Sequence, residues 1–371
     1  MTDYKDVDQV EGRELGRRLG LSRRQLLAAT TGMAAAAMLA SPTSAMASNA
    51  RLIPAPRRGI ILYTVRDAVS RNPVQYPDVA SGFKQVFEVL SQIGYRQIEF
   101  AGYRQNGNSE GGDVNNPDGA RLLRSWLDDY GLVAKGNHGS IPGTITDTTL
   151  AAFDASCEIA NILGLDHIGT GSDPTNSSYV ADWDAAIERW EFLGDRARTM
   201  HGLKLYTHNH DAAYNFLLDS GPLDAMGRPT RSSGVRRLEY FIANTDPENV
   251  HFELDIYWGY VARHRHTAYT APDGSTVESI FDPLALVQQQ TKRFPLFHAK
   301  DGRRDTSVPN GYVMTPFGEG DIDFAGFFKD MGARGWHNPM WEQDTAPGAG
   351  GSTQSLDLAR VSYDNMAALR G

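Results

Sequence analysis

The feature that most constrains the fold is a regular alternation of short apolar runs with longer segments of helical periodicity. The runs recur at intervals of roughly 35 to 45 residues, about the length of one strand–helix unit. A segment with apolar residues three and four positions apart follows the first run, at Phe83, Val86, Phe87, Leu90 and Ile93, and comparable segments follow the others. The eight runs are Ile60–Thr64, Gln97–Phe100, Val133–His138, Asp166–Thr170, Leu203–His208, Val250–Asp255, Phe294–His298 and Pro339–Glu342.

Several of the predicted helices end in a glycine, as at Gly94, Gly131, Gly164 and Gly202. The competing architecture, an open doubly wound sheet, usually carries a GxGxxG turn after its first strand, but Val65-Arg66-Asp67 follows here without a glycine. We therefore predict an α/β protein with a single (β/α)8 TIM barrel as its catalytic domain, over residues 59–371 after a leader at 48–58. The longest predicted loops are Gly259–Ser279 and Gly302–Glu319.

Residues 1–47 are predicted to be a cleaved signal peptide of the twin-arginine type. Arg23 and Arg24 precede an apolar stretch from Leu26 to Ala40, and a small-residue cleavage motif follows at Ala45-Met46-Ala47. The alternative, a membrane anchor, needs about 20 apolar residues, and this stretch is shorter. We expect export to the periplasm or the extracellular space, with no stable membrane anchor after cleavage.

Composition excludes other classes of protein and of site. With 45 acidic and 36 basic side chains the formal net charge is −9, so no nucleic-acid partner is expected. The single cysteine, Cys157, excludes an intramolecular disulfide and a cysteine-cluster zinc site. A metal would therefore need histidine and carboxylate ligands.

Ionisable residues gather at the ends of the predicted strands, where the active sites of such barrels lie. Asp255, His298 and Glu342, with a histidine from the fifth strand, form a mixed nitrogen and oxygen set that suits Mn²⁺, Zn²⁺, Co²⁺, Fe²⁺ or Mg²⁺. We assign the fifth-strand ligand to His210 and a catalytic role to His208. The alternative is that these polar groups only satisfy one another at the barrel rim. The strand-end residues are Glu99, His138, His208, His210, Glu253, Asp255, His298, Lys300, Asp301, Glu342 and Asp344.

The ordered succession of these strand-end phrases resembles the xylose-isomerase-like TIM-barrel superfamily, in its sugar phosphate isomerase/epimerase (AP endonuclease family 2-like) group. The phrases are Gly59–Arg66, Ile98–Gly102, Tyr206–Asp211, Phe252–Trp258, Phe297–Asp301, Gly318–Phe324 and Trp341–Asp344. The resemblance implies one divalent metal on Asp255, His298 and Glu342. It also implies that Glu99, His138 and Lys300 contact substrate or move protons.

Two positions depart from the pattern of that group. Its sugar epimerases present a glutamate at the end of the fifth strand, where this chain has His208-Asn209-His210. A histidine often follows the sixth-strand aspartate by three residues, where this chain has Trp258. An aromatic face of this kind can bind a sugar ring.

The expected function is a metal-dependent sugar isomerase or epimerase that abstracts a proton beside a metal-polarised carbonyl or hydroxyl group. Export and the lack of a phosphate-binding turn favour an unphosphorylated or oxidised sugar as the small-molecule partner. The alternatives are a lyase or hydratase that cleaves 3-keto-glycosides, and a carbohydrate-binding barrel without catalysis. Lys300 could instead form an ion pair with Asp301 or Glu342. We expect Tyr63, Trp258, Asp301 and Trp341 to contact substrate, and the loop Tyr260–Ser279 to be either a lid or a solvated insertion.

Overall fold

The computed structural model describes residues 50–331 and 337–371. The predicted signal peptide and the first two residues of the predicted leader lie outside these ranges. No helix in the described ranges is long and apolar enough to cross a membrane.

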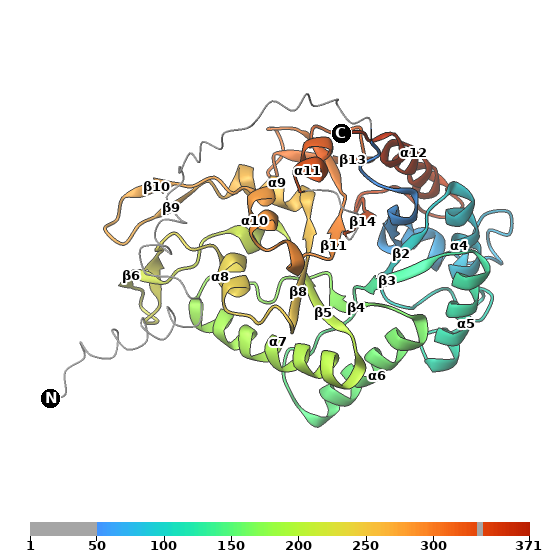
Figure 1. The fold of residues 1–371 in the computed structure, drawn as a ribbon, viewed down its shortest axis with the longest axis horizontal. Coiled ribbons are helices and arrows are strands. Elements are labelled where there is room, and N and C mark those ends of the chain that lie inside the picture. The colour runs from blue at the N-terminus through green and yellow to red at the C-terminus, as the bar shows by residue number, and fades with distance from the viewer. Residues whose placement is uncertain (1–49, 332–336) are drawn as a thin grey trace, which may run out of the picture. The chain divides into compact units, whose positions relative to one another are not determined.

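Eight parallel strands form one sheet in the order β3-β2-β1-β14-β11-β8-β5-β4 (Figure 1). A parallel bridge between His138 and Gly169 joins the two edge strands, and the Gly139 amide donates to the Gly169 carbonyl at 2.8 Å. The sheet therefore closes into the predicted (β/α)8 barrel. Its strands are β1 (Gly59–Ile61), β2 (Gln97–Phe100), β3 (Val133–Asn137), β4 (His167–Thr170), β5 (Lys204–His208), β8 (Val250–Asp255), β11 (Leu296–His298) and β14 (Asn338–Trp341).

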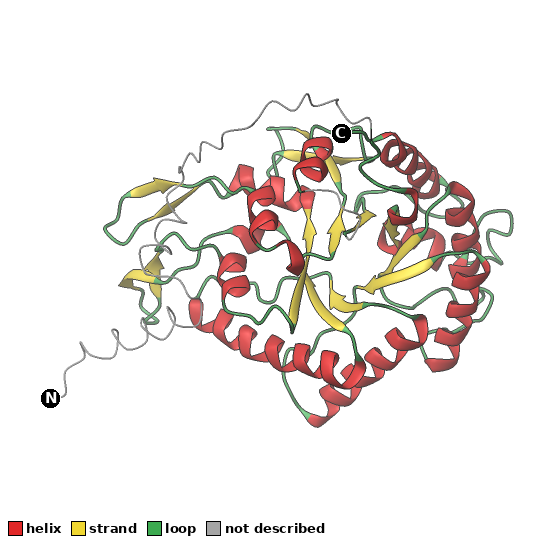
Figure 2. Ribbon diagram, viewed as in Figure 1, coloured by secondary structure: helices red, strands yellow, loops and turns green. Residues whose placement is uncertain are grey.

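Helices surround these strands (Figure 2). Helix α4 presents an apolar stripe to the sheet, with Phe83, Val86, Phe87 and Leu90 all buried. Gly164 and Gly202 end their helices with φ of 72° and 69°, a conformation that side chains disfavour. The helices are α3 (Arg66–Ser70), α4 (Gly82–Ile93), α5 (Pro117–Asp129), α6 (Asp147–Leu163), α7 (Val180–His201), α8 (Arg237–Ala243), α9 (Ile256–Arg265), α10 (Pro283–Gln289), α11 (Phe324–Asp330) and α12 (Gln354–Ala368), with short 3-10 turns η1 (Ala55–Arg57), η2 (Leu62–Val65), η3 (Asp211–Tyr214) and η4 (Thr291–Arg293).

The barrel interior changes from apolar to polar along the strands. Tyr206, Leu296 and Met340 form a small buried cluster apart from the main core. Each stands two residues before a polar residue at its strand end, and side chains two apart point to the same side of a strand. The interior is therefore filled by apolar side chains at one level and lined by ionisable ones at the next.

Two predicted loops contain regular structure instead. The predicted loop Gly259–Ser279 begins inside α9 and continues into a hairpin of β9 (Ala268–Thr270) and β10 (Thr276–Glu278). The loop Gly302–Glu319 lies mostly within and between the strands β12 (Asp301–Arg304) and β13 (Tyr312–Thr315). Another hairpin, β6 (Ser220–Leu223) with β7 (Pro229–Arg231), was not predicted.

The first predicted strand, Ile60–Thr64, is also shorter than expected. It ends at Ile61 as β1, and η2 follows directly. Tyr63 and Thr64 therefore belong to a turn at the barrel mouth, and Tyr63 is 40% exposed.

Candidate metal centre

A cavity of about 420 Å³ opens at the carboxyl ends of the barrel strands. Its ionisable lining consists of His138, His208, His210, Lys300, Glu342 and Asp344, joined by Tyr63. Polar side chains thus line the end of the barrel at which reactions occur in this architecture.

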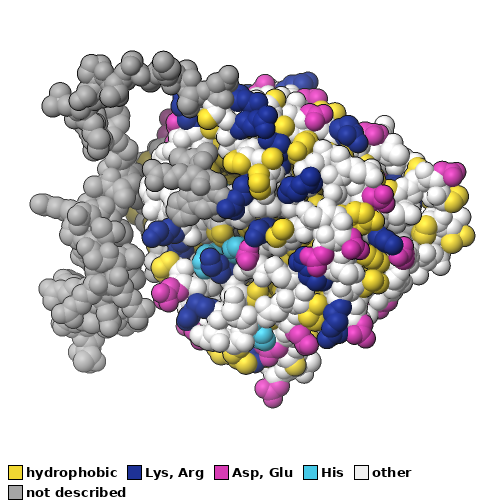
Figure 3. Space-filling model, turned by 45° about the vertical axis from the view of Figure 1, so that its right-hand side comes forward, with side chains coloured by type: hydrophobic (Ala, Val, Ile, Leu, Met, Phe, Trp, Pro, Cys, Tyr) yellow, Lys and Arg dark blue, Asp and Glu magenta, His cyan; other side chains and the backbone are white. Residues whose placement is uncertain are grey.

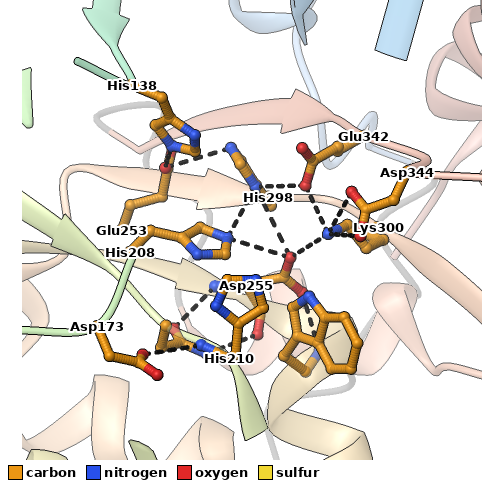
Figure 4. A network of polar contacts seen from close by, with 12 residues as sticks. His138, Asp173, His208, His210, Glu253, Asp255, His298, Lys300, Glu342 and Asp344 are labelled. Carbon is orange, nitrogen blue, oxygen red and sulfur yellow. Dashed lines mark hydrogen bonds and ion pairs between the residues drawn. The ribbon is translucent and has the colours of Figure 1, made fainter. Parts of the chain in front are cut away.

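Four buried residues meet beside the cavity and form what we call the outer cluster: His208, Asp255, His298 and Glu342 (Figure 4). Nδ1 of His298 lies 3.1 Å from Nε2 of His208 and 2.8 Å from Oε2 of Glu342. Oδ2 of Asp255 lies 3.3 Å from Nε2 of His208 and 3.7 Å from Nδ1 of His298. One potential ligand atom from each side chain therefore faces a common point.

The backbone near Asp255 fixes the direction of its carboxylate. Oδ1 of Asp255 accepts the Trp258 amide at 2.9 Å and so caps α9. The Asp255 amide in turn donates to the side chain of Asn209 at 3.0 Å. With one oxygen held by the helix cap, the other faces the outer cluster.

Lys300 neutralises part of the negative charge of the outer cluster. Its Nζ lies 2.8 Å from Oδ2 of Asp255, 2.5 Å from Oε2 of Glu342 and 3.1 Å from Oδ1 of Asp344. Burial alone would raise the pKa values of Asp255 and Glu342, but the nearby Lys300 and His298 charges outweigh it and lower both. Burial alone would lower the pKa of Lys300, and its carboxylate neighbours raise it well above the usual range.

A second group shares His298 with the outer cluster; we call Glu99, His138, Glu253 and His298 the inner cluster. Nε2 of His298 lies 3.0 Å from Oε2 of Glu99 and 3.2 Å from Oε2 of Glu253. Nε2 of His138 lies 2.7 Å from Oε2 of Glu253. Burial raises the pKa of Glu99, raises that of Glu253 to about 7 and lowers that of His138 to about 4.

The donor set of the outer cluster fits a divalent transition-metal ion. It offers two imidazole nitrogens and two carboxylate oxygens, the ligands that Zn²⁺, Mn²⁺, Co²⁺ and Fe²⁺ accept. Nε2 of His208 and Nδ1 of His298 face each other, and a hydrogen bond between them needs a proton on one, whereas a cation between them can use the lone pairs of both. His208, Asp255, His298 and Glu342 could therefore hold the metal.

A family model described as xylose isomerase-like TIM barrel matches residues 87–360. The chain belongs to the xylose isomerase-like TIM-barrel family. No functionally curated protein matches it significantly.

Several solved structures share the fold at low identity. A sugar phosphate isomerase/epimerase from Parabacteroides distasonis superposes with a TM-score of 0.56 at 20% identity, covering 87% of this chain and 98% of that chain. A probable 3-DHS dehydratase from Bacillus anthracis gives a TM-score of 0.54 at 12% identity, covering 83% and 97%. A xylose isomerase domain protein from Alicyclobacillus acidocaldarius gives 0.53 at 13% identity, covering 85% and 100%. At these identities the likeness shows the fold.

The structure places the two fifth-strand histidines differently from the positions that the sequence assignment implies. The outer cluster contains His208, whereas His210 lies outside it and lines the cavity. Strand β5 ends at His208, so the strand alternation that would have given both histidines the same direction stops there. His210 instead precedes the turn η3, and its amide donates to Asp173 at 3.0 Å.

Of the other predicted site residues, one lines the cavity and three lie outside its lining. Tyr63 lines the cavity. Asp301 is buried, and its carboxylate accepts the backbone amides of Gly302, Gly318 and Gly320 at 2.7, 2.8 and 3.0 Å, so it organises this loop. Of the two ion-pair partners considered for Lys300, the structure shows Glu342. Trp341 is fully buried outside the cavity lining. Trp258 is also outside the lining, but its ring contacts His210 and lies 5.5 Å from Nζ of Lys300.

Sequence reasoning left four residues near the site without a role. Glu253 and Asp344 were noted as strand-end residues, and strand alternation places Glu253 on the same side as Asp255. Tyr206 donates its hydroxyl to Oε1 of Glu99. Burial raises the pKa of Asp173 to about 7. No local sequence signal marks Tyr206 or Asp173, because each acquires its partner through the barrel.

Proposed function

We propose that this protein is a divalent-metal-dependent sugar isomerase or epimerase. It would remove a proton from the carbon beside a metal-bound carbonyl or hydroxyl group of an unphosphorylated or oxidised sugar. The observation that carries the proposal is the outer cluster, whose His208 and Glu342 also line the cavity.

His208, Asp255, His298 and Glu342 would hold the divalent cation, which would supply Lewis acidity toward a sugar oxygen and so acidify the neighbouring C–H group. The chain supplies two imidazoles for the proton, His138 and His210. Both line the cavity, and burial lowers the pKa of each, so both are neutral at pH 7 and can accept a proton. Lys300 stays charged beside its carboxylates and cannot act as the base.

The two imidazoles lie on different sides of His208 (Figure 4). Their ring centroids are 5.3 and 5.1 Å from that of His208. We propose that one removes the proton and the other supports its return, which yields isomerisation or epimerisation according to the carbon and face that receive it. Further, Tyr63 would contact the sugar at the cavity mouth.

The charge of the cavity supports an unphosphorylated substrate. Lys300 is the single Lys or Arg among the described lining residues, and it is bound to three carboxylates. A phosphate group would approach Glu342 and Asp344 without a free Lys or Arg side chain among the lining residues to receive it. Basic and acidic side chains are interspersed on the face drawn in Figure 3, which does not show a continuous basic surface for a polyanion.

Asp344 favours a lyase or dehydratase as the second candidate. Burial raises its pKa to about 6, so part of this cavity-lining carboxyl is protonated near neutral pH. A protonated carboxyl can donate to a departing oxygen once the neighbouring carbon has lost its proton. Elimination from a 3-keto-glycoside would use the same proton-abstracting groups.

Incubation in D₂O with free aldoses, ketoses and 3-keto-glycosides tests the proposal. We expect solvent deuterium at the carbon beside the carbonyl, with an isomer or epimer as product. His138→Gln and His210→Gln should each slow turnover at least tenfold, while Tyr260→Phe, on α9 outside the cavity lining, should leave it unchanged. An unsaturated or cleaved product would select the second candidate. Sugar binding without exchange would leave a carbohydrate-binding barrel.

A further inference from the structure

Tyr63 and Arg66 stand three residues apart in the consecutive helical turns η2 and α3, so their side chains lie on the same side of the chain. The guanidinium group of Arg66 lies over the Tyr63 ring, with its Cζ 4.2 Å from the ring centroid. Its Nη1 donates to the Tyr63 carbonyl at 2.7 Å, and its Nη2 donates to the Asp344 carbonyl at 2.9 Å. Arg66 thus joins two residues that line the cavity, Tyr63 and Asp344, from a position outside the lining.

We propose that Arg66 is a positioning residue of the sugar site. It holds the Tyr63 ring as a platform with one free face at the cavity mouth, and it fixes that platform relative to Asp344. Arg66 acts through Tyr63 and does not itself contact the sugar. The inference rests on the proposed function, because it assigns the platform to a sugar.

The guanidinium group covers one face of the Tyr63 ring. A cation within about 6 Å of a ring centroid is attracted to the electrons of that face. Tyr63 is nevertheless 40% exposed and lines the cavity, so its ring retains a surface that a ligand can contact. An aromatic face packs against the C–H groups of a sugar ring. Because Arg66 occupies one side of the ring, a sugar can pack only on the other.

These contacts need the planar fork of a guanidinium group. Two N–H groups directed at two carbonyls, together with a place over an aromatic ring, match the geometry that arginine offers and lysine does not. Arg66 has no carboxylate partner among the described residues, whereas Lys300 is bound to three. The role of Arg66 therefore depends on the geometry of its donors, and a lysine should not replace it.

Other hydrogen bonds hold the loop after β14 without Arg66. The Gln343 amide donates to Oγ1 of Thr64 at 3.2 Å. The buried Arg71 donates from Nε to the Gly350 carbonyl at 2.7 Å and from Nη2 to the Ser352 carbonyl at 2.5 Å. This loop should therefore stay folded when Arg66 is replaced, and the change should be confined to the platform.

Asp344 links the platform to the outer cluster. Its Oδ1 lies 3.1 Å from Nζ of Lys300, which is bound to that cluster (Figure 4). By holding the Asp344 carbonyl, Arg66 places the Tyr63 ring relative to the residues that would bind the reacting end of the sugar. The two proposed proton acceptors do not contact Arg66, so its loss should weaken sugar binding more than the chemical step.

Sugar binding and turnover in Arg66 variants test the inference. On the sugar that the protein converts, Arg66→Met should raise KM about tenfold and lower kcat less than about threefold, and Arg66→Lys should do the same. In a Tyr63→Ala background, Arg66→Met should raise KM less than about twofold, because the platform is already absent. Arg121→Met, which changes an exposed arginine of α5, is the matched control and should leave KM unchanged.

Nuclear magnetic resonance of the sugar-free protein gives a readout that does not depend on turnover. The ring carbon signals of Tyr63 can be identified by their loss in Tyr63→Phe. They should shift in Arg66→Met, which removes the group above the ring, and stay in place in Arg121→Met.

The outcomes separate the inference from the proposed function. An unchanged KM in Arg66→Met would overturn the inference and leave the proposed function intact. Full recovery in Arg66→Lys, or an undiminished rise of KM in the Tyr63→Ala background, would also overturn it, because Arg66 would then act by its charge or by contacting the sugar. Turnover of no sugar would overturn the proposed function. Shifted Tyr63 signals would then still support the hold of Arg66 on that ring, and unshifted signals would overturn it.

Discussion

Replacement of Lys300 by methionine tests the electrostatics of the site most sharply. The ammonium group lies within 3.2 Å of oxygens of Asp255, Glu342 and Asp344, and Lys300 is 1% exposed. Removal of one partner of a buried ion pair costs about 3–5 kcal/mol, because the remaining charges stay buried and uncompensated. We expect Lys300→Met to lower the free energy of unfolding of the metal-free protein by about that amount.

The same substitution should raise the affinity of the site for a divalent metal ion. Lys300 contacts the same oxygens of Asp255 and Glu342 that face the outer cluster, and its charge repels a cation there. Without it, we expect divalent metal to bind at least about tenfold more tightly, a gain of about 1.4 kcal/mol. Saturating metal should therefore recover part of the lost stability.

Urea titrations with and without metal measure both effects. Lys135→Met is the matched control, since its Nζ lies 2.5 Å from Asp166 but the pair is partly exposed, and its loss should cost less than about 1 kcal/mol. The reasoning would be refuted if metal-free Lys300→Met lost no more free energy of unfolding than Lys135→Met. It would also be refuted by a variant with weaker metal binding.

Three further substitutions probe other parts of the structure. A methyl group at Gly171 would lie 2.5 Å from Nδ1 of His138, so Gly171→Ala should displace that ring and lower kcat at least about tenfold, with little change in the circular dichroism spectrum. The carboxyl of Asp173 has a pKa of about 7 in the folded protein against 3.8 when unfolded. Its contribution to the free energy of unfolding is therefore complete below about pH 4 and is lost as the pH rises through 7. Asp173→Asn should therefore become about 4 kcal/mol more stable relative to the unchanged chain between pH 4 and 8, in parallel unfolding titrations; an unchanged difference would contradict the raised pKa. Asp301→Asn should lower the unfolding free energy by about 1–3 kcal/mol, because an amide cannot accept all three backbone N–H groups; equal midpoints in urea would show that this loop does not depend on the carboxylate.

Strand–helix periodicity was sufficient to predict the barrel. Each predicted strand overlaps an observed one, because a buried parallel strand is a short apolar run and the following amphipathic helix differs from it in period. Helix α9 was missed because its apolar residues form no single stripe, and because Asp255 was assigned only as the end of a strand. The structure shows that Asp255 also caps this helix.

The sequence was sufficient to predict which strand ends form the site, but not the direction in which each side chain points. Asp255, His298 and Glu342 do converge as expected. Asp255 and His298 end β8 and β11, Glu342 directly follows β14, and these three strands are adjacent in the sheet. The choice between His208 and His210 depends on where β5 stops, and the sequence does not mark that residue. The pairing of His138 with Glu253 crosses the barrel, which local sequence patterns do not report.

Metal analysis combined with turnover tests the central claim most directly. The folded protein, its chelator-stripped form and an Asp255→Asn/His298→Ala variant would be assayed side by side for bound divalent metal and for conversion of free and keto-sugars. The account predicts metal and turnover in the unchanged protein, loss of turnover on stripping with recovery on reloading, and loss of both in the variant. Undiminished turnover in the stripped protein, or in the variant, would contradict it.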